Sequence, residues 1–162
     1  MKKICTLLLA MFACLTLPAC SRAGYADDLS CTEILNGAPL LEGSADAYRS
    51  YDEDYIEFFI GDTSSFNDHI ILYSQEQNDI NEIGVFHAAD QSAVADLSSA
   101  VEAYVDEIKS TQRAFIASYA PAETQKLDSA EVRSYGKYVI YAILSESDKT
   151  ALFEHIDQRL KK

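Results

Sequence analysis

The longest regular pattern in the sequence is an amphipathic segment that runs from Val94 to Tyr119. Its apolar residues recur at intervals of three and four positions, which places them on one face of an α-helix. Asp90 or Ser92 is suited to cap the start of this helix, and Pro121 ends it because proline cannot continue a helix. A long helix with one apolar face needs an equally broad partner surface, so this segment constrains the fold more than any other. The apolar face consists of Val94, Leu97, Val101, Tyr104, Val105, Ile108, Phe115 and Tyr119.

Runs of β-forming residues lie on both sides of this helix. DHIILYS and INEIGVFHA are separated by the polar stretch QEQND, which predicts a hairpin through residues 68–74 and 80–87. After the helix, EVRSY and YVIYAIL flank Gly136, which predicts a short strand that turns into a longer one over residues 138–144.

Shorter helices are predicted at four places, one of which is PAETQKL, where Pro121 suits the first helical turn. Ser30 and Glu33 form a capping-box pattern, so a short helix is expected over residues 31–36, before Gly37. A second helix ends at Gly61 and carries an aromatic face that we expect to join the core. That face consists of Tyr51, Tyr55, Phe58 and Phe59. The C-terminal segment carries a further helical stripe of Leu152, Phe153, Ile156 and Leu160. The predicted fold class is α+β, with a small antiparallel sheet, formed by the hairpin and the C-terminal strands, packed against the long helix and shorter flanking helices.

The first twenty residues resemble the signal of a bacterial lipoprotein. Lys2 and Lys3 precede an apolar run over residues 4–17, which is too short to span a bilayer as a mature helix. LPAC then places Cys20 where the lipobox cysteine receives its diacylglycerol, although Pro18 departs from the usual small residue. The alternative is ordinary signal-peptidase cleavage after Ala23 or Ala26.

This interpretation predicts the domain organisation and the location of the protein. Residues 1–19 form a cleaved signal peptide, residues 20–28 form the lipidated (palmitate-bearing) cysteine and a tether, and residues 29–162 form a single domain. Acyl chains on Cys20 would hold that domain at the extracytoplasmic face of the cell membrane. Of the four cysteines only Cys31 then remains in the domain, and we expect it to be a small buried core residue.

Composition excludes some classes of partner and favours others. The chain has 13 basic and 26 acidic residues and a formal net charge of −13, which argues against nucleic acid as a partner because binding it requires a basic patch. The sequence has no nucleophile elbow, no His-Glu-x-x-His motif and no glycine-rich phosphate loop. We therefore expect no cofactor and favour a binding module over an enzyme.

Two histidines form the one arrangement that could bind a metal. If the predicted hairpin is centred on Gln77, His69 faces Val85, and His87 lies diagonally across on the same face of the sheet. Asp68 or Asp90 could then complete a metal site. A shift of one residue in the register would send the two histidines to opposite faces, which favours the interpretation that they are structural.

Four stretches of the sequence resemble a known family. FFIGDTSSFND, INEIGVFHA, QRAFIASYAPAETQKLDSAEV and YGKYVIYAIL are similar to landmarks of the bacterial lipoprotein family catalogued as domain of unknown function 4358 (DUF4358). The similarity covers residues 28–160 and is strongest at residues 82–86 and 119–121. Members often carry lysine soon after the Val-Phe pair, where this chain has His87, Ala88 and Ala89. The resemblance implies a membrane-anchored location and the limits of the domain, but no activity.

These observations favour one function and leave an alternative. The first is a lipid-anchored extracytoplasmic binding, accessory or sensor module, whose partner is an envelope protein or a small ligand. The alternative is an envelope enzyme or metal-binding factor that uses His69, His87 and nearby carboxylates.

Overall fold

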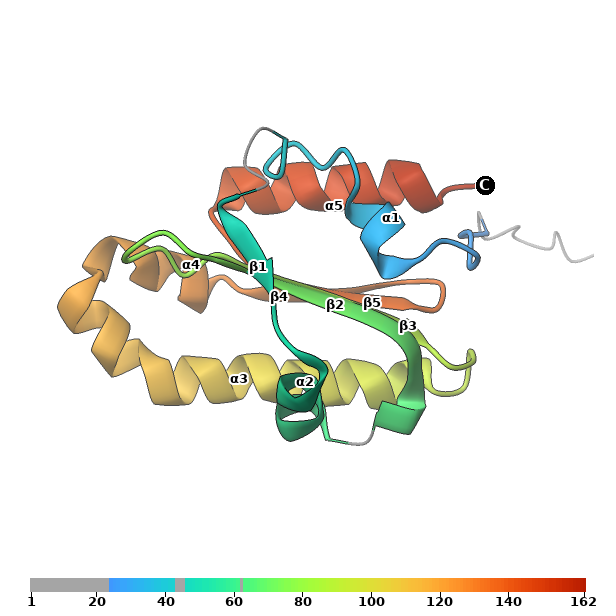
Figure 1. The fold of residues 1–162 in the computed structure, drawn as a ribbon, viewed down its shortest axis with the longest axis horizontal. Helices are drawn as coiled ribbons and strands as arrows, with labels where there is room; N and C mark the ends of the chain where they lie inside the picture. Colours follow the sequence, from blue (N-terminus) through green and yellow to red (C-terminus); the bar gives the residue numbers. More distant parts are fainter. Residues whose placement is uncertain (1–23, 43–45, 62) are drawn as a thin grey trace, which may run out of the picture.

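The computed structural model describes residues 24–42, 46–61 and 63–162, apart from the side chains of Phe59 and Thr63. These residues form a five-stranded antiparallel sheet with strand order β1-β2-β3-β5-β4, and helices cover both of its faces (Figure 1). The predicted α+β class is therefore confirmed. The elements are α1 (Cys31–Leu35), β1 (Tyr48–Ser50), α2 (Glu53–Ile60), η1 (Thr63–Ser65), β2 (Phe66–Ser74), β3 (Glu82–Ala88), α3 (Val94–Tyr119), η2 (Pro121–Glu123), α4 (Thr124–Asp128), β4 (Glu131–Tyr135), β5 (Tyr138–Ile143) and α5 (Glu146–Leu160). Within the described residues, no helix is both long enough and apolar enough to cross a membrane.

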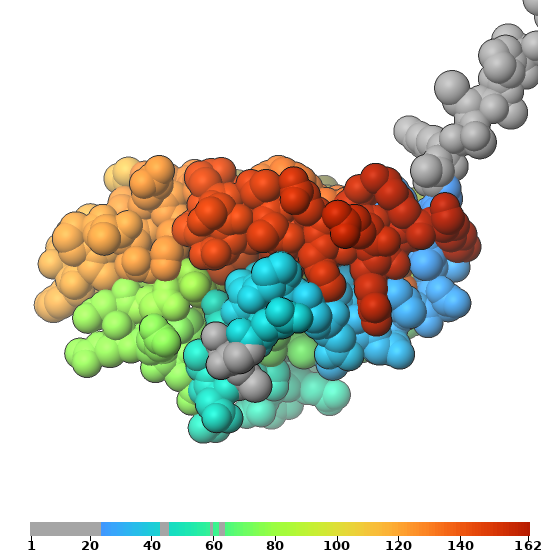
Figure 2. All heavy atoms as spheres, turned by 90° about the horizontal axis from the view of Figure 1, so that it is seen from above, coloured from blue at the N-terminus to red at the C-terminus, as the bar shows by residue number. Residues whose placement is uncertain are grey.

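Helices α1 and α5 cover one face of the sheet. Figure 2 shows α5 lying along this side of the molecule, with the N-terminal segment beside it. The predicted capping box of α1 is present, since the Ser30 hydroxyl accepts a hydrogen bond from the Glu33 backbone N–H at 3.2 Å and Glu33 accepts one from the Ser30 backbone N–H at 2.9 Å. Cys31 is completely buried, as predicted. The core on this face includes Ile34, Ile83, Val85, Ile140, Leu152, Phe153, Ile156 and Leu160.

Helix α3 covers the other face and has the predicted length. Its first turns bury Leu97, Val101 and Val105 beneath the sheet. Beyond them the helix contacts η2 and α4, and there Phe115 and Tyr119 are 60% and 68% exposed. The predicted apolar face is therefore buried only in part, because at this end the helix turns Ile116 rather than Phe115 or Tyr119 towards its neighbours.

Helix α2 is turned differently from the prediction. Ile56 and Ile60 are its buried residues, whereas Phe58 is 80% exposed and Tyr55 is 39% exposed. Tyr51 lies before the first residue of the helix, and the side chain of Phe59 lies outside the described part of the structure. The aliphatic pair faces the core and leaves the neighbouring aromatics at the surface.

The hairpin of β2 and β3 is present, with a register one residue away from the prediction. His69 pairs with Phe86, and Asp68 pairs with His87. Asn78 adopts a left-handed conformation, with φ 67°, in the connecting loop, and the centre of the loop lies between Gln77 and Asn78. Because side chains alternate along a strand, this shift places the two histidines on opposite faces of the sheet.

Gly84 on β3 allows an unusually close approach to a neighbouring strand. A Cβ atom at this position would lie 2.0 Å from Cε1 of Tyr141, which is far below van der Waals contact. The ring of Tyr141 therefore lies across the backbone of β3, and its hydroxyl reaches Glu82 on the same strand. Glycine is required at position 84 because only a residue without a side chain lets the Tyr141 hydroxyl reach Glu82, which belongs to the site described below.

The first described residues lie against the end of α5. The backbone N–H of Ala26 donates to the carbonyl of Leu160 at 2.7 Å, and the Tyr25 ring packs edge-on against Tyr135 at 5.4 Å between ring centroids. Residues 24–28, which the sequence assigns to a tether, are thus in contact with the domain. Cys20 and the predicted signal peptide lie outside the described residues.

Candidate functional site

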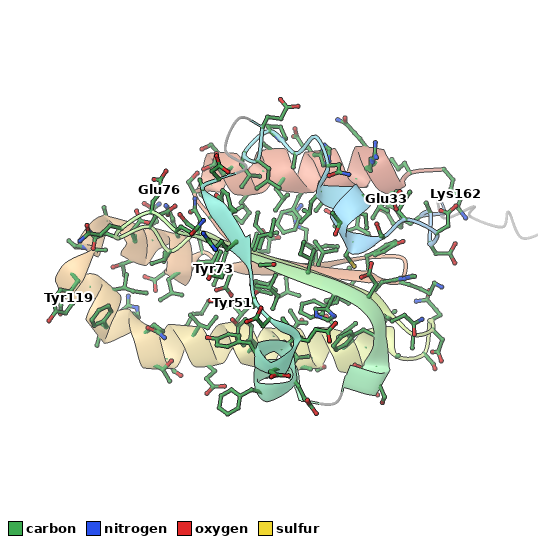
Figure 3. The ribbon with its side chains drawn as sticks, in the orientation of Figure 1. Glu33, Tyr51, Tyr73, Glu76, Tyr119 and Lys162 are labelled. Carbon is green, nitrogen blue, oxygen red and sulfur yellow. The ribbon has the colours of Figure 1, made fainter. Side chains whose placement is uncertain are left out.

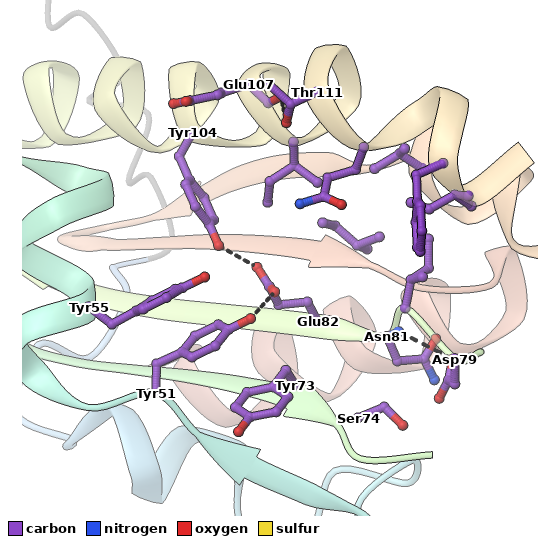
Figure 4. Close-up of a pocket in the computed structure, with 17 residues that line it drawn as sticks. Tyr51, Tyr55, Tyr73, Ser74, Asp79, Asn81, Glu82, Tyr104, Glu107 and Thr111 are labelled. Carbon is purple, nitrogen blue, oxygen red and sulfur yellow. Dashed lines mark hydrogen bonds between the residues drawn. The ribbon is translucent and has the colours of Figure 1, made fainter. Parts of the chain in front are cut away.

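A pocket of about 280 Å³ opens between α3 and the sheet, next to the hairpin loop (Figure 4). The ends of β2 and β3 form its floor, and α3 forms one wall. Tyr51, just before α2, and Tyr55, within α2, contribute two aromatic rings. The pocket is therefore built from segments that are far apart in the sequence. Its polar lining residues include Tyr51, Tyr55, Tyr73, Asp79, Asn81, Glu82, Tyr104, Glu107 and Thr111, and its apolar ones include Ile80, Ile108, Phe115, Ile116, Leu127 and Ile143.

Glu82 lies at the floor of the pocket and is only 8% exposed. Its Oε1 accepts hydrogen bonds from the hydroxyls of Tyr141, at 2.6 Å, and Tyr104, at 2.9 Å. Its Oε2 accepts a third bond from the hydroxyl of Tyr51 at 3.2 Å. The three donors come from β5, from α3 and from the segment before α2, so one carboxylate connects three parts of the fold.

The surroundings of Glu82 act on its pKa in opposite directions. Burial raises the pKa because it removes water from the charged form, while the three tyrosine hydroxyls lower it by donating to that form, and burial is the stronger effect. The pKa values of Tyr51, Tyr104 and Tyr141 are raised by burial and by the charge of Glu82. At neutral pH these hydroxyls keep their protons, which they donate to the carboxylate.

A stack of tyrosines forms one side of the pocket. The Tyr51 ring lies between Tyr55, at 4.2 Å between centroids, and Tyr73, at 4.4 Å, and both pairs are nearly parallel. Figure 4 shows this stack beside Glu82, with the Tyr55 and Tyr51 hydroxyls pointing the same way. Packing between the rings holds the Tyr51 hydroxyl in position to donate.

Ion pairs hold the rim of the pocket. Lys126 lies 2.9 Å from Asp79 and 2.6 Å from Glu123, and it also donates to the side-chain oxygen of Asn81 at 2.9 Å. Burial raises the pKa of Asp79, but bonds with Lys126 outweigh this and leave the pKa lowered. Because Lys126 joins α4 to the hairpin loop, the rim is preorganised in the absence of a ligand.

The charged residues that line the pocket all carry the same sign. Within the described residues they are Asp79, Glu82 and Glu107. Asp79 is neutralised by Lys126, but no lysine, arginine or histidine of the described chain forms an ion pair with Glu82. The charged lining of the pocket is thus acidic only, and among the described residues Glu82 has hydrogen-bond donors but no countercharge.

Comparison with known proteins places the chain in a family. A family model described as "Domain of unknown function (DUF4358)" matches residues 52–144, which is more than half of the chain. The chain belongs to the DUF4358 family. The expected membership in this family is therefore confirmed over residues 52–144, a shorter range than the predicted 28–160. The matched region of this DUF4358 protein includes Glu82, Tyr104 and Tyr141. No curated protein and no solved structure matches the chain.

The candidate metal-site residues of this DUF4358 protein, for which a structural role was favoured, are not brought together. His69 lies on the α3 side of the sheet against Phe66 and Phe86, whereas the ring of His87 stacks on Tyr138 on the other side at 4.5 Å. Asp90 accepts hydrogen bonds from the backbone N–H groups of Ser92 and Ala93 at the start of α3. Among the residues that the structure describes, no three His, Cys, Asp or Glu side chains are grouped to hold a metal ion. Asp68 accepts a bond from the Cys31 N–H at 2.7 Å.

The sequence analysis did not identify the Glu82 pocket as a site. One signal was present, because Glu82 is a charged residue directly before the apolar run IGVF. A carboxylate at the start of a buried strand must find hydrogen-bond donors. Which tyrosines supply them depends on the packing of α3 and β5, which no local pattern reveals.

Proposed function

We propose that this DUF4358 protein is a lipid-anchored, extracytoplasmic binding module that takes a small ligand in the Glu82 pocket. The observation that carries the proposal is a buried carboxylate, held by three tyrosine hydroxyls, at the floor of an open pocket with apolar walls. Ligand sites typically combine an apolar lining with a few converging polar groups. The volume of the pocket suits a ligand of few atoms.

The chemistry of the pocket supports binding rather than catalysis. A general acid must release a proton near neutral pH, but burial and Glu82 raise the pKa values of Tyr51 and Tyr104. Three of the about four acceptor positions of Glu82 are occupied by tyrosine hydroxyls, so its carboxylate is held in place and has at most one position left for a ligand. Both kinds of group are therefore suited to hold a ligand in place.

The proposed anchor is compatible with the position of the pocket. Gly24 follows Cys20 by four positions, and an extended segment of that length spans at most about 14 Å. A lipid on Cys20 would keep the Gly24 end of the domain close to the membrane. Lys162 lies at that end, whereas Tyr119, whose ring packs against the pocket-lining Phe115, lies at the opposite end (Figure 3). In this arrangement the pocket is accessible from the side away from the bilayer.

A pair of tryptophan variants tests the pocket. Thr111 and Ser110 are adjacent exposed residues of α3, and both hydroxyls donate to the carbonyl of Glu107. Only Thr111 lines the pocket, so Thr111→Trp should fill it, whereas Ser110→Trp should not. We expect ligand-observed NMR with a mixed set of cationic, neutral and anionic fragments to detect ligands that bind the wild type and S110W but not T111W. Fragment binding that T111W leaves unchanged would contradict the proposal.

A further inference from the structure

We propose, on the basis of the binding function above, that the ligand is a small organic cation: an ammonium group attached to a compact apolar body. The proposal joins three features of the Glu82 pocket, namely a buried carboxylate without a countercharge, a floor of hydrogen-bond acceptors and an apolar wall.

The first feature is the missing countercharge. A buried carboxylate pairs with a cation, coordinates one or takes up a proton, because an isolated buried charge is costly, and the raised pKa of Glu82 is what burial without a neighbouring cation produces. The three hydroxyls that donate to Glu82 are neutral, and the described cation at the rim, Lys126, is held by Asp79 and Glu123. A cationic ligand would supply the positive charge that the described chain does not place beside Glu82.

The second feature is the direction of the hydrogen bonds. A tyrosine hydroxyl has one proton, and Tyr51 and Tyr104 direct theirs at Glu82. These two hydroxyls therefore have no further proton to donate to a ligand. A carboxylate has about four acceptor positions, and Glu82 uses three of them. An ammonium group brings donors and no acceptor, whereas an anionic ligand would meet acceptors only.

The third feature is the wall that would hold the rest of the ligand. Ile80, Ile108 and Leu127 provide aliphatic surface, and Phe115 and Tyr55 provide aromatic surface near the opening. Aromatic ring faces also attract cations. A body of about the size of a phenylethyl group suits a pocket of about 280 Å³.

Three probes of nearly equal shape and different charge test the ligand class. They are 2-phenylethylammonium, 2-phenylethanol and 3-phenylpropionate, titrated at neutral pH into the full mature chain in nonionic detergent and followed by ligand-observed NMR. We expect the ammonium to bind at least about tenfold more tightly than the alcohol, because a charge-assisted hydrogen bond contributes more than a neutral one. T111W should abolish this binding, and S110W should retain it.

Two charge-removing variants identify the responsible carboxylate. Glu82→Gln should reduce the preference for ammonium over alcohol to less than about threefold. Glu154→Gln removes an exposed carboxylate from α5, on the other face of the sheet, and should leave the preference unchanged.

Each outcome bears on the ligand class separately from the pocket itself. The cation proposal would be overturned if the alcohol or the carboxylate bound as tightly as the ammonium, or more tightly. If T111W abolished that binding, the pocket proposal would remain intact. The cation proposal would also be overturned if the ammonium did not bind, or if T111W left its binding unchanged. The fragment screen independently decides whether the pocket binds any ligand. If E82Q does not fold, the order of the three probes in the wild type still decides the question.

Discussion

At the scale of single residues, Glu82 determines the character of the site. Its carboxylate is buried, connects three tyrosines and lacks a countercharge within the described residues. Gly84, two positions along the same strand, makes this possible because the absence of a Cβ lets the Tyr141 ring cross β3. The two residues act together, since the glycine admits the ring whose hydroxyl stabilises the carboxylate.

The raised pKa of Glu82 predicts a specific pH dependence of stability. Between its unfolded pKa, near 4.5, and its raised folded pKa, the folded state binds more protons than the unfolded state. The stabilising effect of this group is therefore complete below the unfolded pKa and is lost as pH rises through the folded pKa. Glu82→Gln replaces the carboxyl with an amide that cannot titrate. The free energy of unfolding of the wild type minus that of the variant should therefore increase as pH falls through the raised folded pKa towards the unfolded pKa, by up to about 1.4 kcal/mol per pH unit.

Urea unfolding followed by circular dichroism at a series of pH values measures this difference. Subtracting the variant removes the contributions of the other carboxylates, including Asp79 and Asp128, whose pKa values are lowered and whose effects run the other way. A difference that stays constant or decreases as pH falls would show that the pKa of Glu82 is not raised.

At the scale of elements, burial of a helix face depends on what lies against it. Helix α2 has both aliphatic and aromatic residues available, yet it buries Ile56 and Ile60 and leaves Phe58 mostly exposed. Helix α3 buries its apolar face under the sheet and exposes Phe115 and Tyr119 near its end. Helical spacing identifies residues that share a face, but the neighbouring elements decide which face is covered.

A pair of alanine substitutions in α2 tests this assignment. Ile56→Ala should lower the free energy of unfolding by about 2 to 4 kcal/mol because it leaves a cavity in the core. Phe58→Ala removes the larger side chain but should cost less than about 1 kcal/mol, since that ring is 80% exposed. Chemical denaturation of both variants measures the two values. A larger loss in F58A than in I56A would show that the aromatic residues form the buried face.

At the scale of the whole molecule, the two ends of the described chain lie together. Gly24 and Lys162 are joined by a backbone hydrogen bond of 3.1 Å, and the pocket lies toward the other end of the domain. A lipid-anchored protein with this shape would present its acidic pocket away from the membrane. The net charge of −13 would also repel anionic headgroups, which favours the same orientation.

The anchor is tested at Cys20. Cys20→Ala should abolish palmitate labelling and lipoprotein-type cleavage, because alanine offers no thiol for acylation. No mature, lipid-bearing form of the variant should then be found in the detergent phase. Cys31→Ala is the matched control, since it removes the buried thiol of the domain and should leave labelling and cleavage intact. Recovery of a membrane-bound and correctly cleaved C20A variant would contradict the proposed anchor.

Local sequence patterns were sufficient to predict the α+β class, the span of α3, the capping box at Ser30 and the order of these elements along the chain. Each of these depends on interactions between residues close in the chain, so spacing and residue type reveal them. The short strand β1 was not predicted, because its three residues are held by pairing with β2 rather than by a pattern of their own.

Tertiary structure decided the features that matter for function. The left-handed conformation of Asn78 set the hairpin register and so separated His69 from His87, although either register was compatible with the polar loop sequence. The site itself joins Tyr51, Tyr104 and Tyr141 to Glu82 across as many as 59 positions of the chain. A contact of that kind depends on which surfaces pack together, and packing depends on the combined burial of many residues, so no single stretch of sequence specifies it.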